Sequence, residues 1–298
     1  MPCASLWRVL AGIKRQNRTM APENQPKTVQ YQSMQSLRIE MRFGDQMLST
    51  GTAFVAQSLA GPLLITNRHN VTGRHQDTGE PLSKSTCGIP DRIVIAHHLK
   101  GRLGEWVGLT QPLLSDDGQP LWIEHPTLRE KADFVALRLT SIQDVDLYPY
   151  DLANPGPDLL IGPSETVSVV GFPLDIRVNG FVPVWATGFV ASEPALDVDG
   201  LPIFLIDCRT RQGQSGSPVI AYRTGAAVHT NGAVAMNAGG VSRLLGVYSG
   251  RVHKDSDLGR VWKAAAILEL IRSVRPDFSI GPGFYAAVSR AASTGESA

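Results

Sequence analysis

The sequence is built from short apolar runs that end at glycine, proline or aspartate. Runs of this kind with turn residues between them are typical of strands in β-sandwiches and β-barrels. The 29 glycines and 20 prolines of the 298-residue chain supply the turns. Only residues 257–274 have helical spacing, with Asp257 as the expected N-cap and Pro276 beyond the end. We therefore predict an all-β architecture of β-barrels with a C-terminal α-helix.

The strand-like runs fall into two groups, separated by a stretch with four prolines between Leu147 and Pro163. This stretch is interpreted as a linker because proline interrupts regular structure. The first residues are polar and irregular and the last are small, which favours loose ends. The predicted organisation is a loosely ordered extension (1–34), a first β-barrel (35–147), a linker (148–163), a second β-barrel with the helix (164–276) and a mobile tail (277–298).

Charge and hydropathy exclude several classes of function. The net charge is +1, so electrostatics give no case for a nucleic-acid partner. No apolar run is long enough for a transmembrane helix, and we expect no stable membrane insertion. In residues 1–18 the basic side chains follow the apolar ones, which is the wrong order for a secretory signal. The oligomeric state stays open.

The cysteines are few and odd in number: Cys3, Cys87 and Cys208. Such a set gives no disulfide framework and favours a reducing, cytoplasmic location. Cys208 precedes a candidate nucleophile and is a possible rival to it, although a buried strand cysteine is the favoured interpretation. No histidine or cysteine cluster has metal-ligand spacing; His97 and His98 are adjacent and indicate a strand pair, so no metal or cofactor is expected.

The run Gly213-Gln-Ser-Gly-Ser-Pro218 places a serine between two glycines, before an apolar strand. Glycine permits a positive φ and leaves backbone N–H groups uncovered. Uncovered N–H groups are what an oxyanion hole requires, because they can meet the charge of a tetrahedral intermediate. Ser215 is therefore a candidate nucleophile, although ordinary Gly-Ser turns have the same composition.

Two upstream residues could activate Ser215. His69 follows the apolar run Leu63–Thr66, and Asp133 opens the alternating run 132–139, where packing gives no reason for a carboxylate. Each alone is compatible with a structural role. The order His, Asp, Ser, however, is one of the known orders of the acyl-transfer triad. In that triad, imidazole removes the serine proton and the carboxylate fixes the imidazole tautomer.

Together these residues resemble the trypsin-like (chymotrypsin-fold) serine peptidases, most closely the disulfide-free bacterial Deg-type protease domains, here without a PDZ domain. The segments that carry the resemblance stand in family order: Gly51–Val55, Leu64–His69, Ala132–Leu137, Val169–Pro173, Thr187–Ala191 and Gly213–Pro218. The resemblance implies two packed six-stranded antiparallel β-barrels followed by a C-terminal α-helix.

The resemblance also implies a function. It implies a serine endopeptidase that hydrolyses peptide bonds of protein or peptide substrates through an acyl-enzyme. His69 would be the general base, Asp133 its orienting partner and Ser215 the nucleophile. The backbone N–H groups of Gly213 and Ser215 would form the oxyanion hole.

The chain departs from the family pattern at two positions of the serine turn. Gln214 stands where digestive relatives have an aspartate that pairs with a freed N-terminal amine. An uncharged amide cannot form that ion pair, so activation by N-terminal trimming is not expected. Ser217 stands where the family has glycine, which raises the question of whether the turn still forms.

The residue six before the nucleophile, at the base of the primary specificity pocket in the trypsin-like frame, is Arg209. With Thr210 and Ser249 it gives the predicted substrate-binding set. An arginine there would favour a carboxylate before the scissile bond, since Arg pairs bidentately with carboxylates. The alternative is a differently built, Deg-type loop that prefers small apolar residues, with Arg209 in solvent.

Two other functions share parts of this pattern. An α/β-hydrolase elbow requires Gly-x-Ser-x-Gly, which Ser217 breaks, and helical crossovers that the sequence lacks. A catalytically silent trypsin-fold module that binds peptides or partners is the second alternative. The presence of all three triad residue types argues against the loss of turnover.

Overall fold

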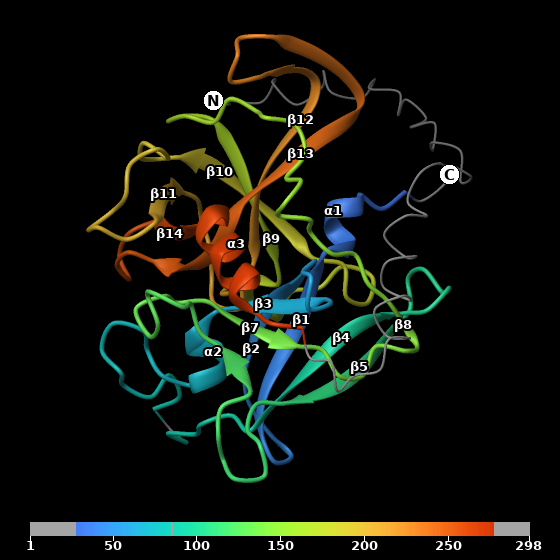
Figure 1. Ribbon diagram of the computed structural model, residues 1–298, viewed down its shortest axis with the longest axis vertical. Helices are drawn as coiled ribbons and strands as arrows, with labels where there is room; N and C mark the ends of the chain where they lie inside the picture. Colours follow the sequence, from blue (N-terminus) through green and yellow to red (C-terminus); the bar gives the residue numbers. More distant parts are fainter. Residues whose placement is uncertain (1–27, 85, 277–298) are drawn as a thin grey trace, which may run out of the picture.

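The computed structural model describes residues 28–84 and 86–276. The helical elements are α1 (Tyr31–Met34), α2 (Arg68–Thr72), a 3₁₀ turn η1 (Pro173–Asp175) and α3 (Ala264–Ser273). Two β-structures pack against each other, one above the other, and α3 lies near the middle of the molecule where they meet (Figure 1). The predicted fold class, all-β with a C-terminal helix, is confirmed.

The two predicted ends of the chain are described only in part. Residues 1–27 of the expected extension and the expected tail 277–298 lie outside the described residues. Residues 31–34, which were predicted to be loosely ordered, form α1. Tyr31 of this helix contacts Tyr148 edge to face at 5.7 Å, which ties α1 to the segment that joins the two β-structures.

The first β-structure is an antiparallel sheet in the order β5-β4-β1-β2-β3-β7-β6, with β8 paired to β4. Its strands are β1 (Ser36–Phe43), β2 (Gln46–Ala56), β3 (Leu63–Thr66), β4 (Arg92–Leu99), β5 (Trp106–Pro112), β6 (Trp122–Ile123), β7 (Val135–Arg138) and β8 (Val145–Asp146). In place of the expected six-stranded barrel, the pairing runs over eight strands without closing. The two-residue strand β6 pairs with β7 alone, so the order ends there.

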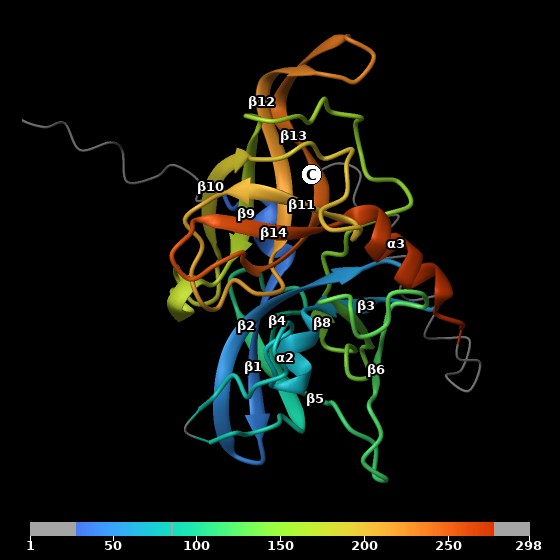
Figure 2. The ribbon, with the colours of Figure 1, turned by 90° about the vertical axis from the view of Figure 1, so that its left-hand side faces the viewer.

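The second β-structure is a closed six-stranded antiparallel barrel in the order β10-β11-β14-β13-β12-β9, as expected for this half. Its strands are β9 (Thr166–Gly171), β10 (Val184–Val190), β11 (Ile203–Asp207), β12 (Pro218–Val228), β13 (Val234–Arg251) and β14 (Leu258–Lys263). Strands β12 and β13 continue beyond the barrel as a long hairpin that projects from one end of the molecule (Figure 2).

Register brings two distant segments to one edge of the first sheet. Strand β3 pairs antiparallel with β7, and Thr66 at the end of β3 lies opposite Val135 at the start of β7. The chain that leaves β3 and the chain that enters β7 therefore meet. These are the segments that carry His69 and Asp133.

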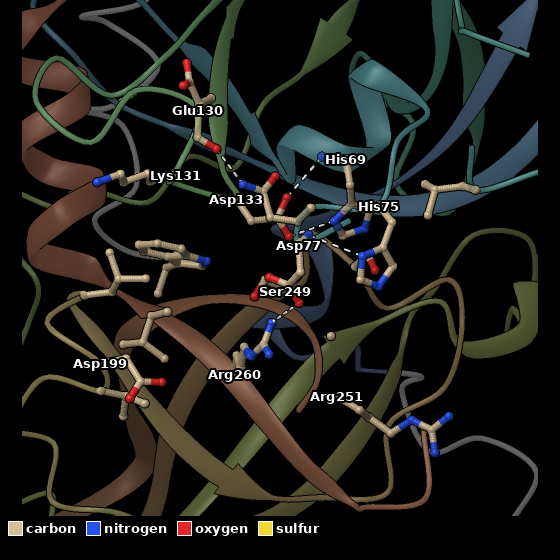
Figure 3. A pocket seen from close by; sticks show the side chains of 18 residues that line it. His69, His75, Asp77, Glu130, Lys131, Asp133, Asp199, Ser249, Arg251 and Arg260 are labelled. Atoms are coloured by element: carbon tan, nitrogen blue, oxygen red, sulfur yellow. Dashed lines mark hydrogen bonds and ion pairs between the residues drawn. The ribbon is translucent and has the colours of Figure 1, made fainter. Parts of the chain in front are cut away.

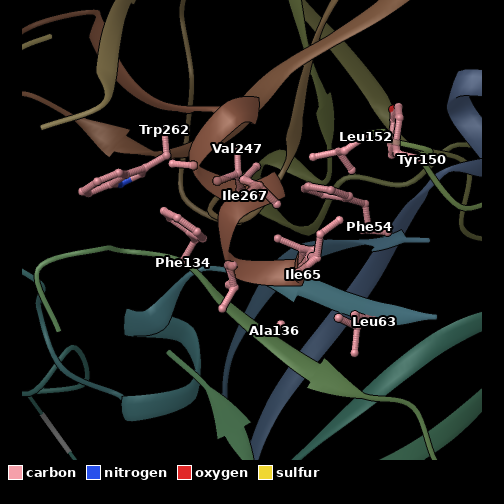
Figure 4. Close-up of a cluster of buried hydrophobic side chains, with 14 of the residues drawn as sticks. Phe54, Leu63, Ile65, Phe134, Ala136, Tyr150, Leu152, Val247, Trp262 and Ile267 are labelled. Atoms are coloured by element: carbon pink, nitrogen blue, oxygen red, sulfur yellow. The ribbon is translucent and has the colours of Figure 1, made fainter. Parts of the chain in front are cut away.

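One hydrophobic core joins the two β-structures (Figure 4). The first sheet contributes Phe54 and Phe134, the barrel contributes Val247 and Trp262, and α3 contributes Ile267. The rings of Phe134 and Trp262 lie 5.4 Å apart between centroids. Burial of these large side chains, each worth about 1.5–3 kcal/mol, fixes the two halves relative to each other.

The C-terminal helix begins later than its apolar spacing predicts. Residues 258–263 form β14, which pairs with β11 on one side and β13 on the other and so closes the barrel. Val261 and Trp262 favour a strand, and both are buried there. Helix α3 begins at Ala264, with Lys263 and not Asp257 at its N-cap. Tertiary pairing thus overrides helical periodicity in this segment.

The buried histidine His97 should make the fold sensitive to acid. It continues the core-facing row of β4, and its burial, followed by the charge of His98, lowers its pKa from 6.5 to about 4. The unfolded chain takes up this proton near pH 6.5, whereas the folded chain does not until about pH 4. The contribution of His97 to the free energy of unfolding is therefore fully present above pH 6.5, and about 3 kcal/mol of it is lost as the pH falls to 4.

His97→Met should remove this contribution to the pH dependence. Urea unfolding at pH 7 and pH 4 measures the free energy of unfolding for both proteins. We expect the variant to lose about 3 kcal/mol less than wild type between these pH values. Equal losses would mean that His97 is already protonated in the folded protein.

Candidate active site

A cavity of about 580 Å³ lies at the boundary between the first sheet and the barrel. His69 and Asp133 line it from the first sheet, and Ser215, Ser249 and Trp262 line it from the barrel. The structure therefore brings the three predicted triad residues to one cavity, although they are separated by up to 146 positions in the sequence.

The His69 and Asp133 side chains are held against each other by two contacts. His69 Nδ1 lies 2.7 Å from Asp133 Oδ2, and the backbone N–H of His69 donates to Oδ1 at 3.0 Å. The Asp133 side chain is only 4% exposed and that of His69 is 12% exposed. Figure 3 shows the imidazole turned toward the carboxylate, with Ser249 nearby. Both carboxylate oxygens thus fix one histidine.

Asn67 holds the aspartate segment from the other side. This residue lies between β3 and α2 and is fully buried, and its Nδ2 donates to the carbonyl of Asp133 at 2.6 Å. The short helix α2 closes when the Gly73 N–H donates to the His69 carbonyl. Hydrogen bonds therefore hold the backbone and the side chain of His69 and of Asp133, and all of them come from residues that follow β3 or precede β7.

The serine turn takes the sharp form that its glycines predict. Gly213 and Gly216 have φ of 94° and 88°, the left-handed region that favours glycine. Their surroundings also exclude a side chain: a Cβ on Gly216 would lie 2.0 Å from the carbonyl oxygen of Thr52. Ser217, which stands where the family has glycine, has no positive φ. That replacement is therefore compatible with the turn.

Gln214 completes the turn without a charge. The side chain is fully buried, and its Oε1 accepts the backbone N–H of Arg211 at 2.8 Å. A side-chain to backbone bond of this kind closes a turn locally. An ion pair with a chain terminus is not needed to order this loop.

The serine turn is bound to the first sheet by hydrogen bonds. The Thr52 N–H donates to the carbonyl of Ser215 at 2.9 Å, and Asn70 Nδ2 donates to the same carbonyl at 3.2 Å. Thr52 Oγ1 also donates to the carbonyl of Gly213 at 2.8 Å. Sequence reasoning missed Thr52 and Asn70 as functional neighbours, because no local pattern connects β2 to a loop some 160 residues away.

Gly216→Ala should destabilise the fold, because a methyl group meets the Thr52 carbonyl and a positive φ is strained for alanine. Strain and crowding together predict a loss of about 2–5 kcal/mol in the free energy of unfolding. Gly232→Ala is the matched control, since φ is 80° and a Cβ there meets open space. Urea unfolding should show a loss of about 1 kcal/mol for this control. Equal losses would show that the close approach to Thr52 is unimportant.

Two backbone donors in the turn have no acceptor. Within the described residues, neither the Gly213 N–H nor the Ser215 N–H donates a hydrogen bond to another group of the protein. Buried or half-buried N–H groups are normally paired. Free donors beside a serine that lines a cavity are what a substrate oxygen would require.

Comparison with known proteins identifies the family of the chain. The family model described as a trypsin-like peptidase domain matches residues 51–228, which is more than half of the chain and contains His69, Asp133 and Ser215. The chain belongs to the trypsin-like peptidase family.

Two proteases of known structure are similar to this trypsin-like peptidase. The inactive form of Rv3671c protease from M. tuberculosis is 17% identical over 80% of this chain and 88% of that chain, with a TM-score of 0.42. The active form of the same protease is 17% identical over 83% of this chain and 84% of that chain, with a TM-score of 0.43. The serine endoprotease from Yersinia pestis is 14% identical over 83% of this chain and 68% of that chain, with a TM-score of 0.45. No curated protein matches the sequence.

The structure divides the predicted substrate-binding residues of this peptidase. Ser249 lines the cavity, whereas Arg209 and Thr210 do not. The Arg209 side chain is 85% exposed and lies 3.8 Å from the Asp257 carboxylate. Thr210 is fully buried and its hydroxyl contacts the Tyr248 hydroxyl inside the barrel. Arg209 thus takes the solvent position that was the alternative interpretation.

The loop after α2 forms one wall of the cavity. Sequence reasoning assigned no role to this loop. Arg260 Nη1 on β14 donates to Asp77 Oδ2 at 2.8 Å, and Gln76 Nε2 donates to the carbonyl of Glu130 at 2.5 Å. His75 and Asp77 of this loop line the cavity with Arg260 (Figure 3). The cavity wall is therefore charged and of mixed sign.

Other predicted features have simple places in the described part of the chain. Cys87 is exposed and Cys208 is buried, both as free thiols, and Cys3 lies outside the described residues. Burial raises the pKa of Cys208 to about 11, which makes this thiol a poor nucleophile.

Among the described residues no cluster of side chains could hold a metal ion. None of their helices has the length and apolarity to cross a membrane.

Proposed function

We propose that this trypsin-like peptidase is a serine endopeptidase that acts through an acyl-enzyme with a His69–Asp133–Ser215 triad. The strongest support is the double contact of Asp133 with His69 on the wall of a cavity that Ser215 also lines. A carboxylate that binds Nδ1–H leaves Nε2 as the basic nitrogen of the imidazole. That nitrogen can remove a hydroxyl proton.

The proposed reaction uses these groups in two steps. Ser215 Oγ attacks the carbonyl carbon of the scissile bond while His69 Nε2 takes the hydroxyl proton. The oxyanion that forms accepts hydrogen bonds from the N–H groups of Gly213 and Ser215. The C–N bond then breaks, and His69 gives the proton to the leaving amine. Water attacks the ester with His69 again as base, which releases the acid and restores Ser215.

Reaction with a fluorophosphonate probe tests the proposal directly, because the probe labels only an activated serine. We expect wild type to be labelled and Ser215→Ala to stay unlabelled. Ser217→Ala is the matched control: this serine lies in the same turn, but its Oγ is buried and makes no hydrogen bond to any described residue. Labelling of wild type and control alone supports the proposal. No labelling of any of the three proteins contradicts it and favours the silent binding module.

Arg209 should not determine the cleavage preference of this peptidase. The side chain is exposed and away from the cavity, and an exposed ion pair contributes little. We expect Arg209→Ala to change the cleavage rate of peptides with Asp or Glu before the scissile bond by less than about threefold. A peptide library read by mass spectrometry measures this rate. Loss of an acidic preference in the variant would show that Arg209 contributes to the primary specificity pocket.

Ser249 remains in the proposed site, because it lines the cavity at the end of β13 beside Gly250 and Arg251. Protein or peptide chains are the proposed substrates. The cytoplasmic location expected from the cysteine content stays a prediction.

A further inference from the structure

Two consecutive residues beside the serine turn adopt a strained backbone. Leu174 and Asp175 have φ of 51° and 59°, although neither is glycine. Strain of this kind persists only where the surroundings over-determine it, and it concentrates at functional sites. The turn that they form, η1, follows Phe172, whose carbonyl oxygen would lie 2.3 Å from a Cβ on Gly213. The strained turn is therefore in direct contact with the proposed oxyanion loop.

The strained turn makes one hydrogen bond to that loop. The Leu174 N–H donates to the carbonyl of Gln212 at 2.6 Å. In a planar trans peptide the C=O and the next N–H point in opposite directions. When the Gln212 carbonyl faces Leu174, the Gly213 N–H must face away from the strained turn. This bond thus sets the direction of one of the two free donors.

An ion pair from the other β-structure holds the strained turn. Arg38 on β1 donates through Nε and Nη2 to the two carboxylate oxygens of Asp175, with 3.1 Å for the Nη2 bond. Its Nη1 donates to Glu40 at 2.7 Å, and the guanidinium lies 5.7 Å from the centroid of the Phe181 ring. The Arg38 side chain is only 6% exposed, whereas that of Asp175 is 34% exposed. A bidentate pair with a buried arginine fixes geometry as well as charge.

We propose that the Arg38–Asp175 pair is a positioning device for the oxyanion hole. It holds Leu174 and Asp175 in the left-handed conformation, so that the Leu174 N–H binds the Gln212 carbonyl and the Gly213 N–H stays turned toward substrate. Neither Arg38 nor Asp175 lines the cavity, so both act through the loop. The inference rests on the proposed function, because it concerns the same oxyanion hole.

The test compares Asp175→Asn and Arg38→Lys with wild type in the hydrolysis of p-nitrophenyl acetate. Asparagine keeps the size of Asp175 but loses the charge, and lysine keeps the charge of Arg38 but cannot span two oxygens. Arg223→Met is the matched control, since Arg223 pairs with Glu165 at 2.6 Å in the barrel, away from the strained turn. Thermal unfolding of each variant shows whether the fold is retained.

We expect kcat to fall by roughly 10- to 100-fold in Asp175→Asn and Arg38→Lys, somewhat less than when an oxyanion donor is deleted. KM should stay unchanged, because the oxyanion forms only after binding. The Arg38 hydrogen bond lowers the pKa of Asp175 below 3.8, so its carboxylate is charged throughout the neutral range. The loss in Asp175→Asn should therefore be the same at every pH from 6 to 9.

The outcomes separate this inference from the proposed function. A wild-type kcat in Asp175→Asn, an equal loss in Arg223→Met, or a rise in KM without a fall in kcat would overturn the positioning role alone. A wild type that neither reacts with fluorophosphonate nor hydrolyses the ester would overturn the proposed function itself. If both variants fail to fold, fluorophosphonate labelling of Leu174→Pro gives a further measurement, because Leu174 is exposed and its side chain fills no core. Proline has no N–H for the Gln212 carbonyl and cannot take the positive φ, so labelling should be about tenfold slower or more; labelling at the wild-type rate would overturn the positioning role.

Discussion

Ser215→Ala is expected to lower the turnover of peptide and ester substrates by four to six orders of magnitude. The hydroxyl is the proposed attacking group, and neither His69 nor Asp133 can replace it. The remaining rate, still above that in water, would come from substrate binding and the free N–H groups of Gly213 and Ser215. Cleavage of a fluorescein-labelled casein and of p-nitrophenyl acetate measures the effect.

The triad should also behave as one unit. His69→Ala alone and the double variant with Ser215→Ala should be about as slow as Ser215→Ala, because loss of either group removes the same step. Thermal unfolding of Ser215→Ala should stay close to wild type, whereas His69→Ala leaves the buried Asp133 Oδ2 without its donor and should lower the melting temperature. A double variant that is slower by the product of the single effects would show that the two residues act independently.

Asp133→Asn should lower kcat about 10⁴-fold and leave the fold intact. In wild type both carboxylate oxygens accept hydrogen bonds from His69, one from the backbone N–H and one from Nδ1–H. An amide has one oxygen, and the backbone N–H is an obligatory donor. The Asn oxygen would bind that N–H and its NH₂ would face Nδ1. Nδ1 must then be the acceptor, and the proton sits on Nε2, where it cannot serve as a base.

Steady-state kinetics and ¹⁵N spectra of the imidazole check this prediction. The spectra should show the Nε2–H tautomer in Asp133→Asn and the Nδ1–H tautomer in wild type. The matched control is Asp77→Asn, which changes another carboxylate on the cavity wall without a bond to His69. A wild-type rate in Asp133→Asn would mean that another group orients His69.

The fold class could be predicted from the sequence, and the three residues predicted for the triad line one cavity in the structure. His69 and Asp133 stand out because polar side chains follow or precede buried strands at positions where packing does not require them. The register of β3 with β7 explains why both signals arise at one edge. The helix prediction for residues 258–263 was wrong because the spacing of Val261 fits a helix face, whereas barrel closure requires a strand there.

The contacts that connect the two halves could not be predicted. Thr52, Asn70 and Arg38 lie on or beside the first sheet and bind loops more than 130 positions away. A single sequence carries no signal for such pairs, because each residue is also an ordinary strand or helix residue. The solvent position of Arg209 has the same cause: only the length and path of the loop decide it.

The hydrophobic core that both halves share has a consequence for fragments of the protein. A chain cut in the linker would leave Phe54 and Phe134 of one piece and Trp262 and Ile267 of the other open to water. Each piece keeps a smaller hydrophobic cluster of its own but loses the shared core, so each should be less stable than the whole chain, and inert because the triad is divided. Co-expressed in one cell, the two pieces have matching apolar faces and should reassemble. The peptidase is thus suited to division into a split reporter, in which hydrolysis returns only when the pieces meet.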